Sequence, residues 1–427
     1  MQNSFYLNHQ IIDNLRKQWF FVTKLAQKLS FRGLLTHAIG YLQALVMRFI
    51  LFCWIIIIGT ALDLSAQDSV QLAQDKLRLA EQHLSLGIAD HSVAPRNNNG
   101  IRVAFYNAEN LFWPEDDSLT RDDDFTKDGL KHWSFYRYQQ KLNNIYKVLM
   151  ALGGWEPPAV VGFCELEHKK VLEDLINKTP LRKYGYEIVH EESPDRRGID
   201  VGFIYRKSKF EYLNHEAMRV NFPFDSTLRT RDVLHVQGRV LGRDTLSVFV
   251  NHWPSRWGGQ AKSEPKRVYV ASMVRARIDE LYQKQPNLKA VVMGDMNDHS
   301  YNISLVETLR AKGEKEEVRK GDLFNYMHGL GKNWQLGSHK YQGHWGTLDH
   351  LIVSEPLLNE QRPNALRATE DGAHIFAARF LLEEDTKHLG LQPFRTYAGP
   401  RFIGGFSDHL PIYIDLMYTP DALSIEE

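Results

Sequence analysis

The sequence predicts an α/β domain with a layered, mixed β-sheet structure over residues 100–418. Short runs rich in β-branched and aromatic residues, such as VAFYN, DVGFIYR and KAVVMGD, have the composition of β-strands. Between some of these runs, apolar residues recur at helical spacing, over residues 138–152 and 264–281. The pattern is neither a strict strand–helix alternation nor all-strand, which favours a mixed sheet covered by helices.

Composition and charge fit a globular protein with a sizeable core. The chain has 427 residues, of which 43% are hydrophobic and 24% charged, and this length allows one large domain or two ordinary ones. The formal net charge is zero, so there is no overall attraction to nucleic acid or to anionic membranes. The 2 cysteines, Cys53 and Cys164, are too few for a disulfide framework or a CxxC zinc site.

Residues 1–66 are predicted to be a leader that is separate from the fold. Residues 49–62 are almost wholly apolar and follow Arg48, a run that is short for a membrane span of about 20 residues but suits a secretory signal. The small-residue sequence LSA precedes Gln67 and offers a cleavage site, and Met47 is the expected start. We therefore expect export to the periplasm or the medium. The alternative is a membrane anchor formed by an uncleaved 49–62 segment.

Three other segments lie outside the regular pattern. Residues 67–99 are predicted to form a helix followed by a polar linker, and residues 419–427 a tail. Residues 362–400 show little periodicity, so we expect an insertion or a long loop there.

Polar side chains cluster where the predicted strands begin or end. Taken singly, Asp and Asn are common in turns, and a lone His is more often a satisfied buried imidazole than a catalyst. Here the clusters recur on separate strands, each beside an apolar run, which indicates one shared site. The clusters are Asn107 and Glu109, Glu165 and Glu167, Asp200, Asn251 and His252, Asp295 with Asn297 and Asp298, Asp349, and Asp408 and His409.

These residue types suit metal-assisted hydrolysis of a phosphate ester. Carboxylate and amide oxygens without thiolates favour a hard cation, Mg²⁺ or Mn²⁺. Histidines with acidic partners allow an imidazole to be held in one tautomer as an acid or base. Cleaving a phosphate ester requires neutralised phosphoryl oxygens, an aligned water and a stabilised leaving group.

As an ordered set, the motifs YNAEN, CELE, NHWPSR, GDMND, LDH and SDH resemble the endonuclease/exonuclease/phosphatase superfamily, which includes deoxyribonuclease I. The resemblance extends from about Val103 to Leu416. It implies a four-layer α/β/β/α sandwich, in which two packed mixed sheets are flanked by helices. It also implies an active site at one end of the sheets.

The resemblance further implies which residues hold the metal and the water. Glu165 matches the principal metal-binding glutamate, with Asp408 as a second carboxylate and Asn107 beside them. Asp295 and Asn297 match the pair that orients the attacking water and holds the phosphate.

Two histidines complete the implied catalytic set. His409 matches the catalytic imidazole, and Asp349 the carboxylate that orients it. His252 matches the second histidine of the nuclease-like members, and Asp200 is its expected partner.

Phosphate contacts and departures from the family pattern are less regular. Arg256 and Arg197 are the expected phosphate contacts because they adjoin His252 and Asp200 in the sequence. Cys164 stands where members often have Gln, so a supporting hydrogen bond is missing. Trp257 could stack on a base or sugar, whereas Trp253 is more suited to core packing.

We therefore expect a divalent-metal-dependent phosphodiesterase that uses in-line attack of water, foremost an exported nuclease acting on nucleic acid. A phosphomonoesterase, or a phospholipid- or inositol-type phosphoesterase, is the alternative within enzymes. An apolar membrane-contacting loop within 362–400 would favour the lipid substrate. A non-catalytic binding module is less consistent with the sequence, because no expected ligand or catalytic residue is missing. No obligate protein partner is indicated.

Overall fold

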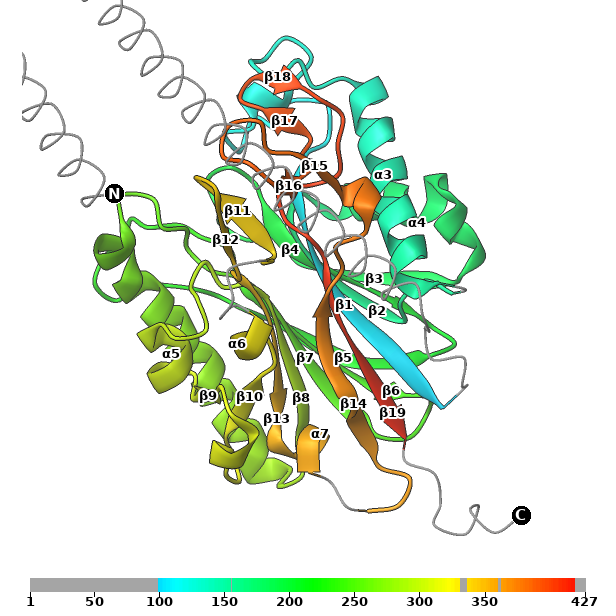
Figure 1. The fold of residues 1–427 in the computed structure, drawn as a ribbon, viewed down its shortest axis with the longest axis vertical. Helices are drawn as coiled ribbons and strands as arrows, with labels where there is room; N and C mark the ends of the chain where they lie inside the picture. The colour runs from blue at the N-terminus through cyan, green and yellow to red at the C-terminus, as the bar shows by residue number, and fades with distance from the viewer. Residues whose placement is uncertain (1–98, 155, 331–335, 360–361, 419–427) are drawn as a thin grey trace, which may run out of the picture. The chain divides into compact units, whose positions relative to one another are not determined.

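Two β-sheets pack face to face in the computed structural model, which describes residues 99–154, 156–330, 336–359 and 362–418 (Figure 1). The six-stranded sheet has the order β14 (Leu366–Ile375), β19 (Ile412–Tyr418), β1 (Gly100–Leu111), β2 (Val160–Leu166), β4 (Asp200–Arg206) and β3 (Tyr186–His190). The seven-stranded sheet has the order β5 (Phe210–Met218), β6 (Val233–Val240), β7 (Thr245–His252), β8 (Lys289–Asp295), β13 (Asp349–Ser354), β10 (Leu323–Asn325) and β9 (Ala311–Lys312). Both sheets are mixed, because β1–β2 and β7–β8 are parallel and most other neighbours antiparallel.

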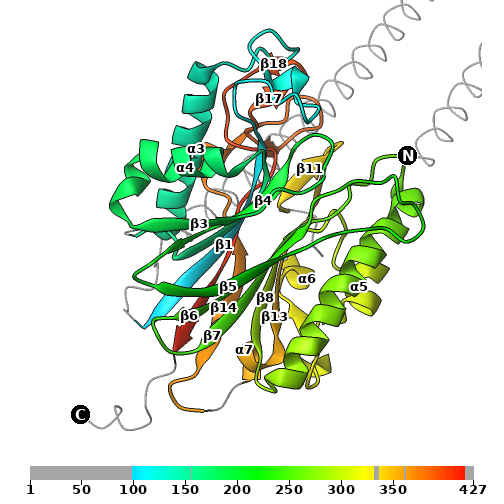
Figure 2. The same cartoon turned by 180° about the vertical axis from the view of Figure 1, so that it is seen from behind.

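Helices cover the outer faces of the two sheets, as Figure 1 and its rear view in Figure 2 show. Helices α3 (Phe135–Gly153) and α4 (Lys169–Lys178) pack on the six-stranded sheet, and α5 (Gln260–Lys284) on the seven-stranded one. The short helices are α6 (Met327–Leu330) and α7 (Glu355–Asn359). Ser134 caps α3 by accepting a hydrogen bond from the backbone N–H of Arg137. The predicted four-layer α/β/β/α sandwich is confirmed.

The sheets approach closely because the facing side chains include a glycine. A Cβ added to Gly162 of β2 would lie 2.5 Å from the methyl carbon of Met293 on β8. The opposite face of β8 instead packs on α5, where Val292 joins Val270, Val274 and Ile278. Alternate residues of β8 therefore contribute to two different core layers, as strand geometry requires.

The polar strand ends meet at one end of the sandwich. The parallel strands β7 and β8 place His252 opposite Asp295, and the antiparallel partner of β8 places Asp349 opposite the same residue. Three small hairpins lie at this end (Figure 1): β11–β12 (His339–Tyr341, His344–Gly346), β15–β16 (Leu382–Glu384, Leu391–Pro393) and β17–β18 (Tyr397–Ala398, Arg401–Phe402).

Residues 362–400 are not a single insertion, and that prediction was wrong. Leu366–Ile375 form β14, the edge strand of the six-stranded sheet, which pairs with β19. An irregularity between Ala368 and Ala373 interrupts the pairing of β14 with β19. The middle of the strand is polar and faces solvent, so its sequence lacks the alternation of apolar and polar residues that marks a strand. Residues 376–402 carry the two hairpins β15–β16 and β17–β18 instead of an open loop.

The predicted leader, its start at Met47, the 67–99 helix and linker (apart from Asn99), and the 419–427 tail lie outside the described residues. Among the described residues, no helix is long and apolar enough to cross a membrane.

Candidate active site

The carboxylate of Asp295, at the end of β8, is the centre of the polar cluster. Its Oδ2 accepts a hydrogen bond from the Asn107 amide at 3.2 Å. The same oxygen lies 3.8 Å from Nε2 of His409 and 3.9 Å from Nε2 of His252. Burial raises the pKa of Asp295 to about 7; His409 opposes this rise and Asp349 adds to it. One carboxylate oxygen thus faces an amide and two imidazoles.

His409 is held by a carboxylate on the neighbouring sheet. Its Nδ1 lies 2.7 Å from Oδ2 of Asp349, and both side chains are buried. Burial alone would lower the pKa of His409, but Asp349 and Asp295 together raise it well above its usual value. The imidazole is therefore protonated at neutral pH, with its Nε2 directed toward Asp295.

His252 differs from His409 in charge. Burial, together with the guanidinium groups of Arg231 and Arg197, lowers its pKa, so it is neutral at pH 7. Its Nε2 lies 3.9 Å from Glu165, and its Nδ1 is buried without a hydrogen-bond partner.

Asp200 does not contact His252 in the way the sequence suggested. Its Oδ1 accepts hydrogen bonds from the backbone N–H and the hydroxyl of Ser193, and its Oδ2 lies 3.4 Å from Nε2 of His190. The predicted Asp200–His252 pair is therefore wrong. Asp200 begins β4 opposite Leu166, and its carboxylate turns to the β3–β4 loop.

Two of the expected metal ligands, Glu165 and Asp408, interact electrostatically with a buried ammonium group. Lys141 of α3 interacts electrostatically with Glu109, Asp408 and Glu165, in that order of strength. Glu165 is fixed at its Oε2 by the backbone N–H of Asn110, at 3.1 Å. Carboxylates are the hard oxygen donors that Mg²⁺ and Mn²⁺ prefer. The donor set therefore suits the expected cation.

Asp408 is kept ionised by nearby positive groups. Burial alone would raise its pKa, but His409, His339 and Arg395 lower it below the usual value. The guanidinium of Arg395 lies 3.8 Å from its Oδ2. An ionised carboxylate beside Lys141 is available to a metal ion.

Glu109 and Lys141 form part of the site floor that sequence reasoning missed. Glu109 Oε2 accepts a 2.6 Å hydrogen bond from the backbone N–H of Thr396 and lies 3.8 Å from Lys141 Nζ. Lys141 also donates to the Thr396 hydroxyl and to the Phe406 carbonyl. Glu109 stood in the YNAEN motif, but nothing in the sequence around Lys141 distinguished it from an ordinary helix residue.

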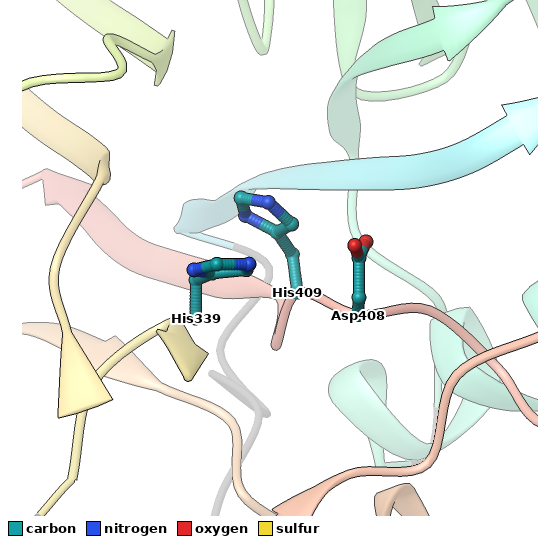
Figure 3. Close-up of side chains that lie close together, drawn as sticks. All are labelled: His339, Asp408 and His409. Carbon is teal, nitrogen blue, oxygen red and sulfur yellow. The ribbon is translucent and has the colours of Figure 1, made fainter. Parts of the chain in front are cut away.

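His339 is a further residue that the sequence did not indicate, and Figure 3 shows it beside His409 and Asp408. It lies on β11, and its ring packs against that of His409 with 4.6 Å between ring centroids. His339, Asp408 and His409 each offer a ligand atom within 4.8 Å of the others. Burial and His409 lower the pKa of His339 to about 4, so its ring is neutral. Its short hairpin carries no motif that could have revealed it.

The GDMND turn is built by internal hydrogen bonds. Asn297 adopts a positive φ of 49°, and its backbone N–H donates to Oδ1 of Asp295 at 2.9 Å. The Asn297 amide donates to the Trp253 carbonyl at 3.1 Å. Trp253 itself is fully buried, as its core role required.

The expected arginines have different surroundings. Arg256 donates to the Asn297 carbonyl at 2.7 Å and to Asn302 at 3.2 Å, so its guanidinium braces the GDMND segment. Arg197 is half exposed and lines the catalytic pocket. Arg231 also lines it and is buried, donating to the Trp253 carbonyl at 2.7 Å. The sequence analysis did not single out Arg231.

Two adjoining pockets open over these residues. The first, of about 490 Å³, contains Glu165, His252, Asp295, Asn297 and His409 together with Arg197 and Arg231. The second, of about 550 Å³, is more apolar and is lined by Trp257, Tyr341 and Trp345. Trp257 and His339 border both, and the Trp257 side chain is 88% exposed.

A sequence model of the family described as Endonuclease/Exonuclease/phosphatase matches residues 102–418. A search of curated proteins found no match. An endonuclease/exonuclease/phosphatase family protein from Bacteroides thetaiotaomicron is similar in structure, with 16% identity, coverage of 75% of this chain and 98% of its own, and a TM-score of 0.46. The human nocturnin catalytic domain with bound sulfate has 16% identity, coverage of 75% and 95%, and a TM-score of 0.44. A mannosyl-6-phosphatase from Bacteroides thetaiotaomicron has 16% identity, coverage of 74% and 99%, and a TM-score of 0.44. Identities of this size say nothing about the substrate of this chain.

Proposed function

The chain belongs to the endonuclease/exonuclease/phosphatase family and is a metal-dependent phosphoric ester hydrolase, and on that premise we propose that it is a phosphodiesterase acting on nucleic acid. The observation that carries the proposal is the setting of Asp295. Its Oδ2 faces two imidazoles and an amide within a pocket that also contains two arginines. Such a pocket can hold a phosphoryl group between an attacking and a leaving oxygen.

Glu165, Asp408 and Asn107 would hold Mg²⁺ or Mn²⁺, which supplies charge neutralisation at the phosphoryl oxygens. Asp295 would accept the proton of the attacking water, since a pKa of about 7 suits a base at neutral pH. Asn297 would hold the phosphate and align that water.

The two histidines would take different tasks because their charges differ. Protonated His409, oriented by Asp349, would stabilise the charge of the phosphoryl group. Neutral His252 would donate an N–H hydrogen bond toward the leaving oxygen. Arg197 and Arg231 would contact the non-bridging oxygens.

The second pocket favours a diester over a monoester. A monoester needs space for one organic group, whereas a diester places groups on both sides of the phosphorus. The aromatic lining next to the catalytic pocket, with exposed Trp257 and Tyr341, suits a stacked base.

A lipid substrate has less support. Among the described part of residues 362–400, the exposed large apolar side chains are Phe380 and Leu389. Two isolated side chains do not make a membrane-binding surface. We also propose export of the protein on the strength of the apolar run 49–62, with anchoring through that run as the alternative.

The test is hydrolysis of bis-p-nitrophenyl phosphate against p-nitrophenyl phosphate with Mg²⁺, with Mn²⁺ and with EDTA, followed by nicking of supercoiled plasmid. We expect metal-dependent cleavage of the diester and of the plasmid. Turnover of the monoester alone would replace the proposal with a phosphatase. Activity that persists in EDTA would contradict the metal requirement.

A further inference from the structure

A second group of metal-ligand side chains lies beside the catalytic site, on the far side of β2. His190 ends β3, Asp200 begins the antiparallel strand β4, and Glu192 lies in the loop between them. Each offers one ligand atom, and the three atoms lie within 4.8 Å of one another. None of the three has a role in the proposed hydrolysis.

Two of these atoms are buried without a hydrogen-bond partner. Nε2 of His190 and Oδ2 of Asp200 are 3.4 Å apart, and both side chains are only 2% exposed. Oδ1 of Asp200 is already held by Ser193, which aims Oδ2 at the imidazole. Buried polar atoms normally make well-formed hydrogen bonds, and these two have only their 3.4 Å ion-pair contact with each other, which leaves room for a shared ligand.

We propose that His190, Glu192 and Asp200 bind a divalent transition-metal ion, with Zn²⁺ as the best match, at a site separate from the catalytic ion. Imidazole nitrogen and carboxylate oxygen are both donors that Zn²⁺ accepts, and a water molecule would complete four-coordination. Ser193 supplies the outer hydrogen bonds that orient the Asp200 ligand. The Glu192 side chain is 65% exposed and leaves the ion a route from solvent.

The position of the site suggests what the ion stabilises. The loop 191–199 starts and ends at the ligands and carries Asp195, whose Oδ2 lies 3.2 Å from the guanidinium of Arg231. The same loop carries Arg197. Both arginines line the catalytic pocket. The bound ion would fix this loop and, if the proposed function holds, would act on substrate affinity more than on turnover.

Calorimetric titration of the metal-stripped full chain with Zn²⁺ tests the site without any need for hydrolysis. The parent protein for this titration is Glu165→Ala, because loss of this ligand should abolish binding at the catalytic site and leave only the other Zn²⁺ ions to be counted. We expect Glu165→Ala/His190→Gln to bind one Zn²⁺ fewer than Glu165→Ala. Equal stoichiometry and affinity in the two proteins would overturn the proposal.

Two controls keep the comparison interpretable. His215 forms an exposed pair with Glu191, with 3.0 Å between Nε2 and Oε1, so Glu165→Ala/His215→Gln should bind as many Zn²⁺ ions as the parent. In EDTA, the midpoint temperature of thermal unfolding should be the same for the His190→Gln protein and for its parent. Asp200→Asn repeats the test if His190→Gln fails to fold, with the same loss of one ion expected and unchanged binding again contradicting the site.

The effect on the reaction is measured separately in a wild-type Glu165 background. We expect His190→Gln to raise KM for the diester about tenfold in Zn²⁺-supplemented buffer, with kcat within about twofold of wild type. A fall in kcat at unchanged KM would contradict the assigned role of the loop. An inactive wild-type protein would overturn the proposed function and leave the Zn²⁺ count standing.

Discussion

We expect hydrolysis to depend most on Asp295. Asp295→Asn keeps the shape and the hydrogen bond from the Asn297 backbone but removes the base, so kcat should fall by about 10²–10³ or more. Initial rates on bis-p-nitrophenyl phosphate measure this. Asp225→Asn, which changes a partly exposed turn carboxylate bonded to Thr227, is the control and should retain full activity. Full activity in Asp295→Asn would remove Asp295 from the mechanism.

A buried histidine away from the site makes the protein sensitive to acid. His235 stacks on Phe249 with 4.3 Å between centroids, and neither ring nitrogen has a hydrogen-bond partner. Burial lowers its pKa to about 3, so the folded state resists a proton that the unfolded chain binds near pH 6.5. Its contribution to stability is complete above pH 6.5 and is lost progressively as the pH falls toward 3.

His235→Phe should therefore weaken the dependence of the unfolding free energy on pH below pH 7. Between pH 7 and pH 5 the wild-type protein should lose about 2 kcal/mol more unfolding free energy than the variant. Urea unfolding at the two pH values measures the difference. His215→Phe, at a partly exposed position on β5, should leave the wild-type pH dependence intact. Equal slopes in wild type and His235→Phe would contradict the assignment.

Among the structural elements, the segment before β19 is held by one helix. Lys141 on α3 bonds to Thr396 and Phe406 and is paired with Glu109 at the site floor. Burial raises the pKa of Glu109 to about 7 and lowers that of Lys141, so each depends on the other for its charge. Removal of one partner leaves the other buried and unpaired.

Lys141→Met should accordingly lower the free energy of unfolding by about 3–5 kcal/mol. Lys141→Met/Glu109→Gln should recover most of that loss, because the charge of Glu109, which lies 3.8 Å from Lys141, is removed together with its partner. Lys178→Met is the matched control, since the Lys178–Asp174 pair of 2.9 Å is half exposed and should contribute less than about 1 kcal/mol. Denaturant unfolding at pH 7 compares the four proteins, and a double variant as unstable as Lys141→Met would refute the coupling.

The loop after β7 and the β11–β12 hairpin are predicted to bind the organic part of the substrate. Trp257→Ala should raise KM for an oligonucleotide about tenfold, as expected for loss of one stacking contact, while kcat changes little. Tyr136→Ala on α3, at a similarly exposed aromatic, should change neither constant. Unaltered KM in Trp257→Ala would exclude the aromatic pocket from substrate binding.

Long elements were predictable from the sequence and short ones were not. The helix over 138–152 and the strands that end in polar clusters have strong periodicity, and these placed Asn107, Glu165, Asp295 and His409 together. β14 was missed because an edge strand with polar, exposed residues lacks alternation. His339 was missed because a three-residue strand carries too little pattern to place a side chain.

At the scale of the whole molecule, the layered fold followed from the order of the motifs, whereas pairings between side chains did not. Asp200 illustrates the difference, because its strand was predicted correctly but its carboxylate faces Ser193 and His190. Which way a side chain at a strand end turns depends on the local loop, and sequence spacing does not encode it. The same reason explains why Arg231 was underrated beside Arg256.

The neutral net charge predicts weak salt dependence of substrate binding. With Arg197 and Arg231 as the two phosphate-binding cations, log affinity for an oligonucleotide should fall with log salt at a slope of about −1.4 to −1.8. The slope is obtained from KM values measured at NaCl concentrations from about 50 to about 200 mM. Arg197→Gln should reduce the magnitude of this slope by about 1. A steep slope for the wild-type protein would contradict the prediction, because it would require a basic surface that these two arginines do not supply.

The final strand has a central place that affects when the enzyme becomes active. β19 lies between β14 and β1, and His409 comes just before it in the chain. A growing polypeptide emerges from its N-terminus, so every earlier catalytic residue leaves the ribosome before His409 does. The first strand, β1, can pair with β2 early, but its pairing with β19 must wait until residues 412–418 have been made. A hydrolase built in this order should stay inert until the segment that carries His409 has left the ribosome.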